Sequence, residues 1–254
     1  MDLGLKGKKA IVCASSKGLG RGCAEALAEA GCDLALNGRD KETLAKTADA
    51  IRQRYGVEVK EIAGDVSLPD VQAELIAAFS APDILVNNNG GPPPKPFRAL
   101  DREAILAGVT KNMVTPIELI QAVIDGMAER GFGRIVNITS LSVYVPIPNL
   151  ELSSGARAGL TSFLAGVAPT VAARNVTINS LLPGKLDTDR LRGLVAEGET
   201  EEQRRARLIA NIPAKRLGTP EEFGKICAFL CSVHAGYLTG QNIPVDGGLY
   251  VSAF

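Results

Sequence analysis

The sequence predicts an α/β fold in which a doubly wound, mainly parallel sheet of about seven strands forms a single domain over residues 1–254. Two observations lead to this prediction. Short, almost continuously apolar runs alternate along the whole chain with longer segments of helical periodicity. No shift in composition divides the 254 residues into two parts. Strands that are apolar on both faces and alternate with helices are typical of parallel sheets with helices on both sides.

The expected elements follow one another in strict order. The expected strands are Lys9–Ala14, Asp33–Asn37, Val57–Ala63, Asp83–Asn87, Gly133–Ile138, Asn175–Leu181 and Gly240–Val245. The expected helices are Arg21–Ala30, Lys41–Tyr55, Pro69–Phe79, Arg102–Glu129 and Ser153–Ala173. Pro116 and Pro169 should each bend or interrupt a long helix. The charged segment Thr188–Arg216 is either a solvated surface excursion or a lid, and its place after a Pro-Gly turn favours a substrate lid over residues 186–216.

Composition argues against several classes of function. Lysine plus arginine and aspartate plus glutamate both number 28, so no broad charge favours nucleic acid or an anionic membrane. No apolar run reaches the roughly 20 residues that span a bilayer, and the first residues lack the apolar core of a signal peptide. The five cysteines show no Cys-x-x-Cys spacing, and His234 is the only histidine. We therefore expect a cytoplasmic protein with buried, reduced thiols and no metal site.

A glycine-rich loop follows the first expected strand and leads directly into the first expected helix. Gly18 and Gly20 would let the backbone turn tightly and approach a pyrophosphate, which the start of the helix stabilises. The loop resembles the Thr-Gly-x-x-x-Gly-x-Gly signature of the short-chain dehydrogenase/reductase family, with Cys13 and Ala14 at its first two positions. The cofactor-binding residues expected in this loop are Ser15, Ser16, Lys17, Gly18, Leu19 and Gly20.

Further segments resemble the same family in chain order, so the resemblance covers essentially the whole chain. The run Asn87-Asn88-Asn89-Gly90 is similar to the family's Asn-Asn-Ala-Gly element, and Asn112 matches its helix asparagine. The resemblance implies a Rossmann-type fold that binds a nicotinamide cofactor. It implies cofactor contacts from a set of residues beyond the glycine loop, namely Asp65 and Val66 near the adenine, Asn88, Gly90, Pro183, Gly184 and Thr188.

The residues after the second strand predict NADP(H) rather than NAD(H). An acidic residue there would accept hydrogen bonds from the ribose 2′-hydroxyl and repel a 2′-phosphate, but the chain has Asn37-Gly38-Arg39 instead. Lys17, in the glycine loop, is a second cation. Two cations that converge on one phosphate favour the phosphorylated cofactor, although the alternative is a pair of solvated surface cations.

The expected catalytic segment departs from the family pattern. Ser140 and Asn112 match the family's catalytic serine and asparagine, but Ser153 and Arg157 stand where Tyr-x-x-x-Lys is usual. Serine is a poor general acid, and arginine stays protonated while still binding ribose hydroxyls or a carboxylate. We therefore expect Arg157 to preserve cofactor binding, while Ser153 does not preserve the proton step. The chain resembles a divergent branch, similar to 3-oxoacyl-acyl-carrier-protein reductases, that also lacks the tyrosine and the lysine. Tyr144 is the one attractive substitute acid, or else a residue of the pocket wall.

The leading hypothesis is an NADP(H)-dependent oxidoreductase that reduces a carbonyl, or oxidises an alcohol, of a small and possibly acidic substrate. Ser140 would polarise the substrate oxygen, and the proton would come from Tyr144 or from water held by Asn112, Ser153 and Arg157. The alternative is a non-catalytic NADP(H)-binding sensor or partner protein. The family resemblance also implies a homo-oligomer, either a dimer or a homotetramer.

Overall fold

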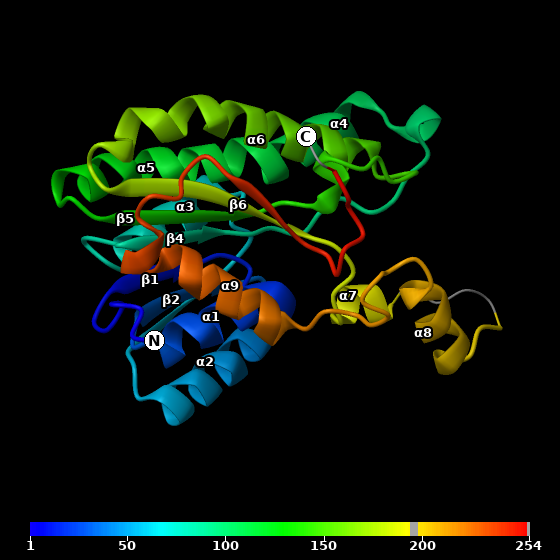
Figure 1. Ribbon diagram of the computed structural model, residues 1–254. Coiled ribbons are helices and arrows are strands. Elements are labelled where there is room, and N and C mark those ends of the chain that lie inside the picture. The colour runs from blue at the N-terminus through cyan, green and yellow to red at the C-terminus, as the bar shows by residue number, and fades with distance from the viewer. Residues whose placement is uncertain (194–197, 253–254) are drawn as a thin grey trace.

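The computed structural model describes residues 1–193 and 198–252, which form three layers with the sheet in the middle (Figure 1). These residues contain seven strands, all parallel, in the order β3-β2-β1-β4-β5-β6-β7. The sheet therefore changes direction of winding between β1 and β4, as expected for a doubly wound fold. The strands are β1 (Lys9–Val12), β2 (Asp33–Gly38), β3 (Val59–Ala63), β4 (Ile84–Asn87), β5 (Gly133–Ile138), β6 (Val176–Pro183) and β7 (Asn242–Val245).

Helices cover both faces of the sheet (Figure 1). One face carries α1 (Gly18–Glu29), α2 (Lys41–Tyr55) and α9 (Pro220–Cys231). The other carries α3 (Pro69–Ala77), α4 (Arg102–Val109), α5 (Thr115–Glu129) and α6 (Glu151–Ala172). Two short helices, α7 (Asp189–Arg192) and α8 (Glu201–Ile209), stand beyond the carboxyl ends of the strands. No helix of the described residues is long and apolar enough to cross a membrane.

Alternate residues of each central strand fill two separate cores. In β1, Ala10 and Val12 pack with the α1 and α9 side, while Ile11 packs with the α5 and α6 side, because successive side chains point to opposite faces. All three are fully buried. This double burial explains why the strands read as continuous apolar runs rather than as alternating ones.

The predicted α/β architecture and its single domain are confirmed, with differences at particular boundaries. β1 ends at Val12 and α1 already begins at Gly18, because the glycine loop turns more tightly than the apolar pattern suggests. The predicted break at Pro116 is present: a π-helical turn over Thr110–Val114 joins α4 to α5, and Pro116 lies in the first turn of α5.

The predicted interruption at Pro169 is wrong, because α6 continues through it to Ala172. Pro169 lies on an exposed face in the last turn of α6. Because proline has no N–H, one carbonyl of the preceding turn lacks its helical hydrogen bond, but this carbonyl faces solvent and can bind water instead. The predicted lid over 186–216 contains α7 and α8, and its residues 194–197 lie outside the described part of the chain.

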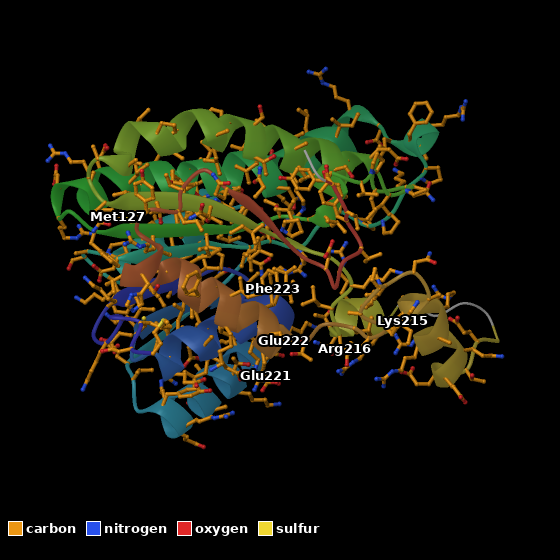
Figure 2. The ribbon with its side chains drawn as sticks, in the orientation of Figure 1. Met127, Lys215, Arg216, Glu221, Glu222 and Phe223 are labelled. Atoms are coloured by element: carbon orange, nitrogen blue, oxygen red, sulfur yellow. The ribbon has the colours of Figure 1, made fainter. Side chains whose placement is uncertain are left out.

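The closest helix contact joins α1 to α9 and depends on two glycines. A Cβ on Gly22 would lie 2.1 Å from the carbonyl oxygen of Pro220, and one on Gly224 would lie 2.0 Å from the carbonyl oxygen of Gly22. Neither backbone can move aside, so only glycine fits at these positions. At the start of α9, the Arg216 guanidinium donates two hydrogen bonds to the Glu222 carboxylate, and Phe223 is fully buried (Figure 2).

All five cysteines are buried and free. Burial raises the pKa of the Cys13 thiol to about 12, and a hydrogen bond from the Cys227 thiol to Cys23, together with burial, raises the pKa of Cys227. Thiols held in this protonated state are unreactive packing groups. No cluster of histidine, cysteine or acidic residues suited to a metal ion is present among residues 1–193 and 198–252.

Candidate active site

The predicted cofactor residues meet at the carboxyl edge of the sheet, on both sides of the β1–β4 switch point. In open α/β sheets this crevice is where ligands bind. Gly18 adopts a positive φ of 60°, and a Cβ on Gly20 would lie 2.2 Å from the carbonyl oxygen of Ala14. The N-terminus of α1 has no side-chain cap and no acidic residue in its first turn. Its backbone N–H groups are therefore available to an anion such as a pyrophosphate.

Ala14 occupies a strained position in this loop. Its φ is +44°, in the left-handed region that usually requires glycine. Its amide donates to Asn37 Oδ1 at 3.3 Å, and its carbonyl accepts from Asn88 Nδ2 at 3.2 Å. These two side-chain contacts, one from β2 and one from beyond β4, hold the strained turn in place.

Asn37, near the end of β2, is buried and forms hydrogen bonds with several neighbouring segments. Its side-chain amide donates to the carbonyls of Ile62 and Gly64, both at 3.1 Å, and its side chain is only 1% exposed. Its backbone carbonyl accepts from the amide of Ser15 at 2.7 Å. The Asn37 side chain therefore points into the edge of the sheet and joins β2 to β3.

The two cations predicted to select the cofactor both lie in solvent at this corner of the fold. Lys17 is the N-cap residue of α1, and its ammonium lies 4.0 Å from the Asp189 carboxylate in α7. Arg39 is exposed immediately after β2. Lys17 also contributes to lowering the pKa of Asp40, whose main cause is hydrogen bonding from Thr43, so Lys17 faces the end of β2.

Asp65, beyond β3, is fully engaged within the protein. One carboxylate oxygen accepts from the amide and the hydroxyl of Ser67, and the other accepts from Lys111 Nζ at 3.1 Å. Burial opposes ionisation, but these hydrogen bonds and the Lys111 charge outweigh it and lower the pKa of Asp65 to about 2. The neighbouring Val66 is 3% exposed and packs in the core beneath.

The remaining predicted cofactor residues line the same crevice. The Thr188 methyl group lies 3.7 Å from the point where a Cβ on Gly18 would stand, so Thr188 covers the glycine loop. Gly184 donates to the carbonyl of Val245 at 3.0 Å, which fixes the turn that follows Pro183. Gly90 has no neighbour within 4 Å of its Cβ position and is exposed.

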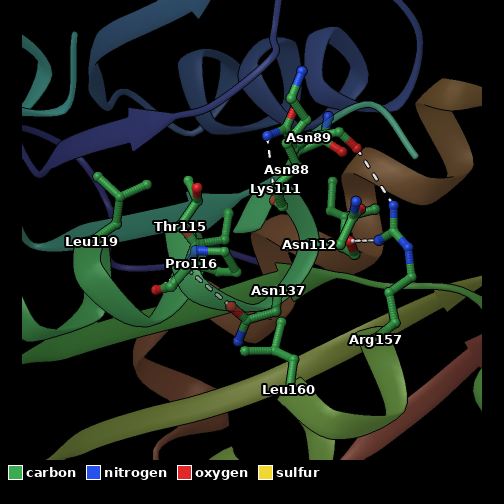
Figure 3. Close-up of a pocket in the computed structure, with 12 residues that line it drawn as sticks. Asn88, Asn89, Lys111, Asn112, Thr115, Pro116, Leu119, Asn137, Arg157 and Leu160 are labelled. Carbon is green, nitrogen blue, oxygen red and sulfur yellow. Dashed lines mark hydrogen bonds between the residues drawn. The ribbon is translucent and has the colours of Figure 1, made fainter. Parts of the chain in front are cut away.

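A small cavity of about 20 Å³, lined by both polar and apolar side chains, lies between β4, β5, α6 and the π-helical turn (Figure 3). This volume suffices for one water molecule. Asn112, which the π-turn carries into the cavity wall, is 4% exposed. Within the described part of the chain, its Oδ1 has no hydrogen-bond partner, nor have Oδ1 of Asn87 and Oγ1 of Thr115. Three orphaned buried acceptors around one cavity are the partners that a bound water needs.

Ser153 and Arg157 lie one turn apart near the start of α6, and the structure brings them into contact. Arg157 is 8% exposed and Ser153 is 6% exposed, and Arg157 Nε donates to the Ser153 hydroxyl at 3.3 Å. Figure 3 shows the guanidinium rising from α6 towards Asn89, whose carbonyl accepts from Nη2 at 3.4 Å.

The strongest contacts of Arg157 are with the end of β5. Nη1 donates to the carbonyls of Ile138 at 2.8 Å and Thr139 at 2.9 Å. Because Thr139 donates to the carbonyl of Leu181, the parallel ladder would next pair the Thr139 carbonyl with residue 183. Residue 183 is a proline without an N–H, so Arg157 supplies the missing donor. Burial, and to a lesser degree Arg190, lower the pKa of Arg157 to about 10, which still leaves it charged at neutral pH.

Ser140 follows β5 and caps a short 3₁₀ turn over Leu141–Val143. Its hydroxyl oxygen accepts from the amide of Ser142 at 3.1 Å, an arrangement that leaves the hydroxyl hydrogen available to a ligand. Tyr144 ends this turn, is 38% exposed, and stacks on Tyr250 with ring centroids 4.8 Å apart. Arg157 thus directs its hydrogen bonds to β5, Asn89 and Ser153, and Tyr144 packs instead against the C-terminal segment.

Three residues of this region were missed by sequence reasoning. Lys111 lines the cavity and pairs with Asp65, Asn89 accepts from Arg157, and Arg190 of α7 reaches the same loop. Lys111 could have been noticed as the neighbour of Asn112. No sequence motif indicates Arg190, because it reaches the loop at Pro92 from a segment about 100 residues away along the chain.

Comparison with known proteins agrees with this geometry. A family described as Enoyl-(Acyl carrier protein) reductase matches residues 13–250. The 3-oxoacyl-[acyl-carrier-protein] reductase FabG of Vibrio cholerae is 34% identical over 249 residues, covering 98% of this chain and all of the relative. Among solved structures, YwfH, an NADPH-dependent reductase involved in bacilysin biosynthesis, is 30% identical with a TM-score of 0.92, covering 97% of this chain and 100% of that one.

A further solved structure is L-sorbose reductase from Gluconobacter frateurii, complexed with NADPH and L-sorbose. It is 28% identical with a TM-score of 0.93, and the likeness covers 99% of this chain and 100% of that one. The matches extend over nearly the full length of both partners, so they concern the whole fold and not one motif. The chain belongs to the short-chain dehydrogenase/reductase family of nicotinamide-dependent oxidoreductases.

Proposed function

We propose that this protein is an NADP(H)-dependent carbonyl reductase of small, acidic substrates whose proton delivery differs from that of most relatives. The observation that carries the proposal is the buried Ser153–Arg157 contact on α6 beside the cavity of Asn112. NADP(H) binding is supported by the uncapped start of α1, the exposed cations Lys17 and Arg39, and the lack of an acidic residue in Asn37-Gly38-Arg39, where an acid would repel a 2′-phosphate.

The geometry supports a division of labour among the residues of the site. Bound NADPH would supply a hydride from C4 of its nicotinamide to the substrate carbonyl carbon. Ser140 donates its free hydroxyl hydrogen to the carbonyl oxygen. A water bound by the orphaned oxygen of Asn112 and by the Ser153 hydroxyl relays a proton from solvent to the alkoxide and so completes the alcohol. Arg157 stays protonated, so it holds the Ser153 hydroxyl in place and does not serve as the acid.

Tyr144 is the alternative proton donor, and substitution can separate the two routes. Tyr144→Phe removes the phenol and keeps the stacking on Tyr250, whereas Ser153→Ala removes the buried hydroxyl. If water delivers the proton, Ser153→Ala lowers kcat and Tyr144→Phe leaves it within about twofold. The reverse result would assign the proton to Tyr144.

The test of the proposed reaction is the transfer of deuterium. The protein is mixed with NADPH deuterated at C4 and a panel of oxo acids and neutral ketones, and the products are analysed by mass spectrometry. Deuterium at the new carbinol carbon in one product supports catalysis. Tight NADPH binding without any transfer contradicts it and favours the competing proposal, a non-catalytic NADP(H)-binding sensor or partner protein. A Gly20→Ala variant, in which the glycine loop is blocked, serves as the background control.

Cofactor selection has its own test. Lys17→Ala and Arg39→Ala should each weaken NADPH binding about tenfold and leave NADH binding nearly unchanged, because each removes a charge-assisted contact to the 2′-phosphate only. Arg54→Ala, at the far end of α2, is a matched control for loss of a surface cation. Equal losses for NADPH and NADH would contradict a 2′-phosphate role.

Two wider features belong to the same proposal. We infer a cytoplasmic protein, because five buried free thiols suit a reducing compartment. We also infer a homo-oligomer, a dimer or a homotetramer, supported by exposed apolar side chains such as Phe163 on α6, which is 46% exposed. Light scattering at micromolar concentration measures the oligomeric state, and a monomer would contradict this inference.

Residues 186–216 are proposed as the substrate lid, since Thr188 lies over the glycine loop.

A further inference from the structure

Arg190 lies beside the site, and no described residue of opposite charge forms an ion pair with it. It lies in α7, is exposed, and its only hydrogen bond among the described residues is a long one, 3.4 Å from Nη2 to the carbonyl of Pro92. The adjacent Asp189 does not neutralise it, because that carboxylate faces Arg192 at 3.7 Å and Lys17 at 4.0 Å. The guanidinium therefore presents an unbalanced charge to the loop after β4.

Arg157 presents a second unbalanced charge to the same loop. A guanidinium has five N–H donors. Within residues 1–193 and 198–252, four of them are used by the carbonyls of Ile138, Thr139 and Asn89 and by the hydroxyl of Ser153. All four acceptors are neutral, and no carboxylate of the described chain lies within ion-pair distance of Arg157. One donor on Nη2 remains for a ligand.

The two guanidinium groups converge on one point above Gly91. The position that a Cβ on Gly91 would take lies 3.1 Å from Nη1 of Arg190 and 3.5 Å from Nη2 of Arg157. Gly91 has no positive φ, so the backbone itself does not require glycine there. The absence of a side chain instead keeps the space between the two cations open. Arg190 and burial both act against the charge of Arg157, and an anion at this point would relieve both effects.

We propose that Arg157 and Arg190 together bind the carboxylate of an oxo acid substrate above Gly91, so that this reductase acts on free oxo acids. The inference rests on the function proposed above and identifies its substrate class. The position suits the chemistry, because Arg157 also contacts Ser153 and the end of β5, which Ser140 follows directly. Ser140, the residue after Thr139, would then act on the carbonyl of the same substrate. A planar, two-oxygen anion matches guanidinium donors better than a neutral ester does.

Binding to the complex with NADP⁺ tests the proposal without requiring turnover. The probes are acetoacetate and methyl acetoacetate, an acid and its neutral ester of nearly equal size, titrated calorimetrically into NADP⁺-saturated protein at low ionic strength. We expect the acid to bind at least tenfold more tightly than the ester. Arg190→Met should remove that tenfold preference, Arg190→Lys should restore part of it, and NADP⁺ affinity should stay within twofold in both variants.

Two further variants sharpen the test. Arg192→Met removes the other arginine of α7, which is paired with Asp187 at 2.8 Å, and should leave acid binding unchanged. Gly91→Ala places a methyl group between the two cations and should weaken acid binding several-fold while the neutral ester binds as before. The affected neighbours are the flexible ends of side chains, so this variant should fold normally.

Several results would overturn the inference. Equal binding of the acid and the ester, or tighter binding of inorganic phosphate than of the acid, would show that the site does not select a carboxylate. A tenfold loss of NADP⁺ affinity in Arg190→Met would assign Arg190 to the cofactor instead. If NADP⁺ binds and deuterium passes only to neutral ketones, this inference fails while the proposed reductase function stands. If NADP⁺ does not bind at all, both fail.

Discussion

Replacing Arg157 by methionine should destabilise the fold, and the structure allows its magnitude to be estimated. Methionine cannot donate to the carbonyls of Ile138 and Thr139, and the second of these faces Pro183, which has no N–H to offer. A hydrogen bond from a charged donor contributes about 1.5–3 kcal/mol. Removing the buried, unpaired charge of Arg157 stabilises the fold and can offset about one of these hydrogen bonds. The loss of two short hydrogen bonds, reduced by this one gain, lowers the free energy of unfolding by about 2–3 kcal/mol.

The assay is urea unfolding followed by circular dichroism, at a fixed protein concentration and without nucleotide. We expect the free energy of unfolding to fall by about 2–3 kcal/mol in urea. In thermal unfolding the same loss corresponds to a fall in Tm of about 5–10 °C for a chain of this length. The matched control is Arg190→Met, which gives up one long, exposed hydrogen bond and should change stability by less than about 0.5 kcal/mol. If Arg157→Met is as stable as the parent, desolvation of the charge outweighs its hydrogen bonds, and the reasoning is refuted.

Three further predictions concern the cofactor crevice. Gly20→Ala should abolish NADPH binding in a fluorescence titration while the far-ultraviolet spectrum stays native, since its methyl would meet the carbonyl of Ala14; retained binding would contradict this. Ala14→Gly should raise the unfolding free energy in urea by up to about 1 kcal/mol, because glycine adopts a φ of +44° without strain, and no gain would show the turn to be relaxed. Asp65→Asn should cost about 1–2 kcal/mol at pH 7, discounted for the partial exposure of Lys111. Because the folded pKa of Asp65 is lowered to about 2, its contribution is complete above about pH 4 and is lost as the pH falls towards 2, so the stability of Asp65→Asn should depend less on pH over that range.

The sheet could be predicted in full because its signal is local. The central strands β1, β4, β5 and β6 are buried on both faces, so most of their residues are apolar whatever the neighbouring strand contains. The predictions failed where the surrounding structure changed the usual effect of a residue on its helix. Proline usually ends a helix, but Pro169 lies in a last turn whose freed carbonyl faces solvent. The π-helical turn that carries Asn112 into the cavity has no sequence signature of its own beyond the proline that follows it.

The candidate site could be predicted only as far as its residues are contiguous in sequence. The glycine loop, Asn88, Ser140 and the Ser153–Arg157 spacing each belong to one short motif. The pairing of Lys111 with Asp65 and the approach of Arg190 to Gly91 join segments separated by 46 and 99 positions, and nothing in either segment alone indicates the other. The acid missing after β2 was visible in the sequence, whereas the reason for Asn37, its hydrogen bonds across three strands, was not.

The glycine contact between α1 and α9 packs these two helices together as one rigid unit. Because the Gly22 carbonyl lies directly against the Cβ position of Gly224, neither helix can shift without the other. The start of α1, at one end of this unit, is where a pyrophosphate would bind. The start of α9, at the other end, lies next to Gly218, which forms a β-bridge with Leu186 at the beginning of the proposed lid. A nucleotide bound at the start of α1 would therefore also fix the position of α9 and of the bridge between Gly218 and Leu186.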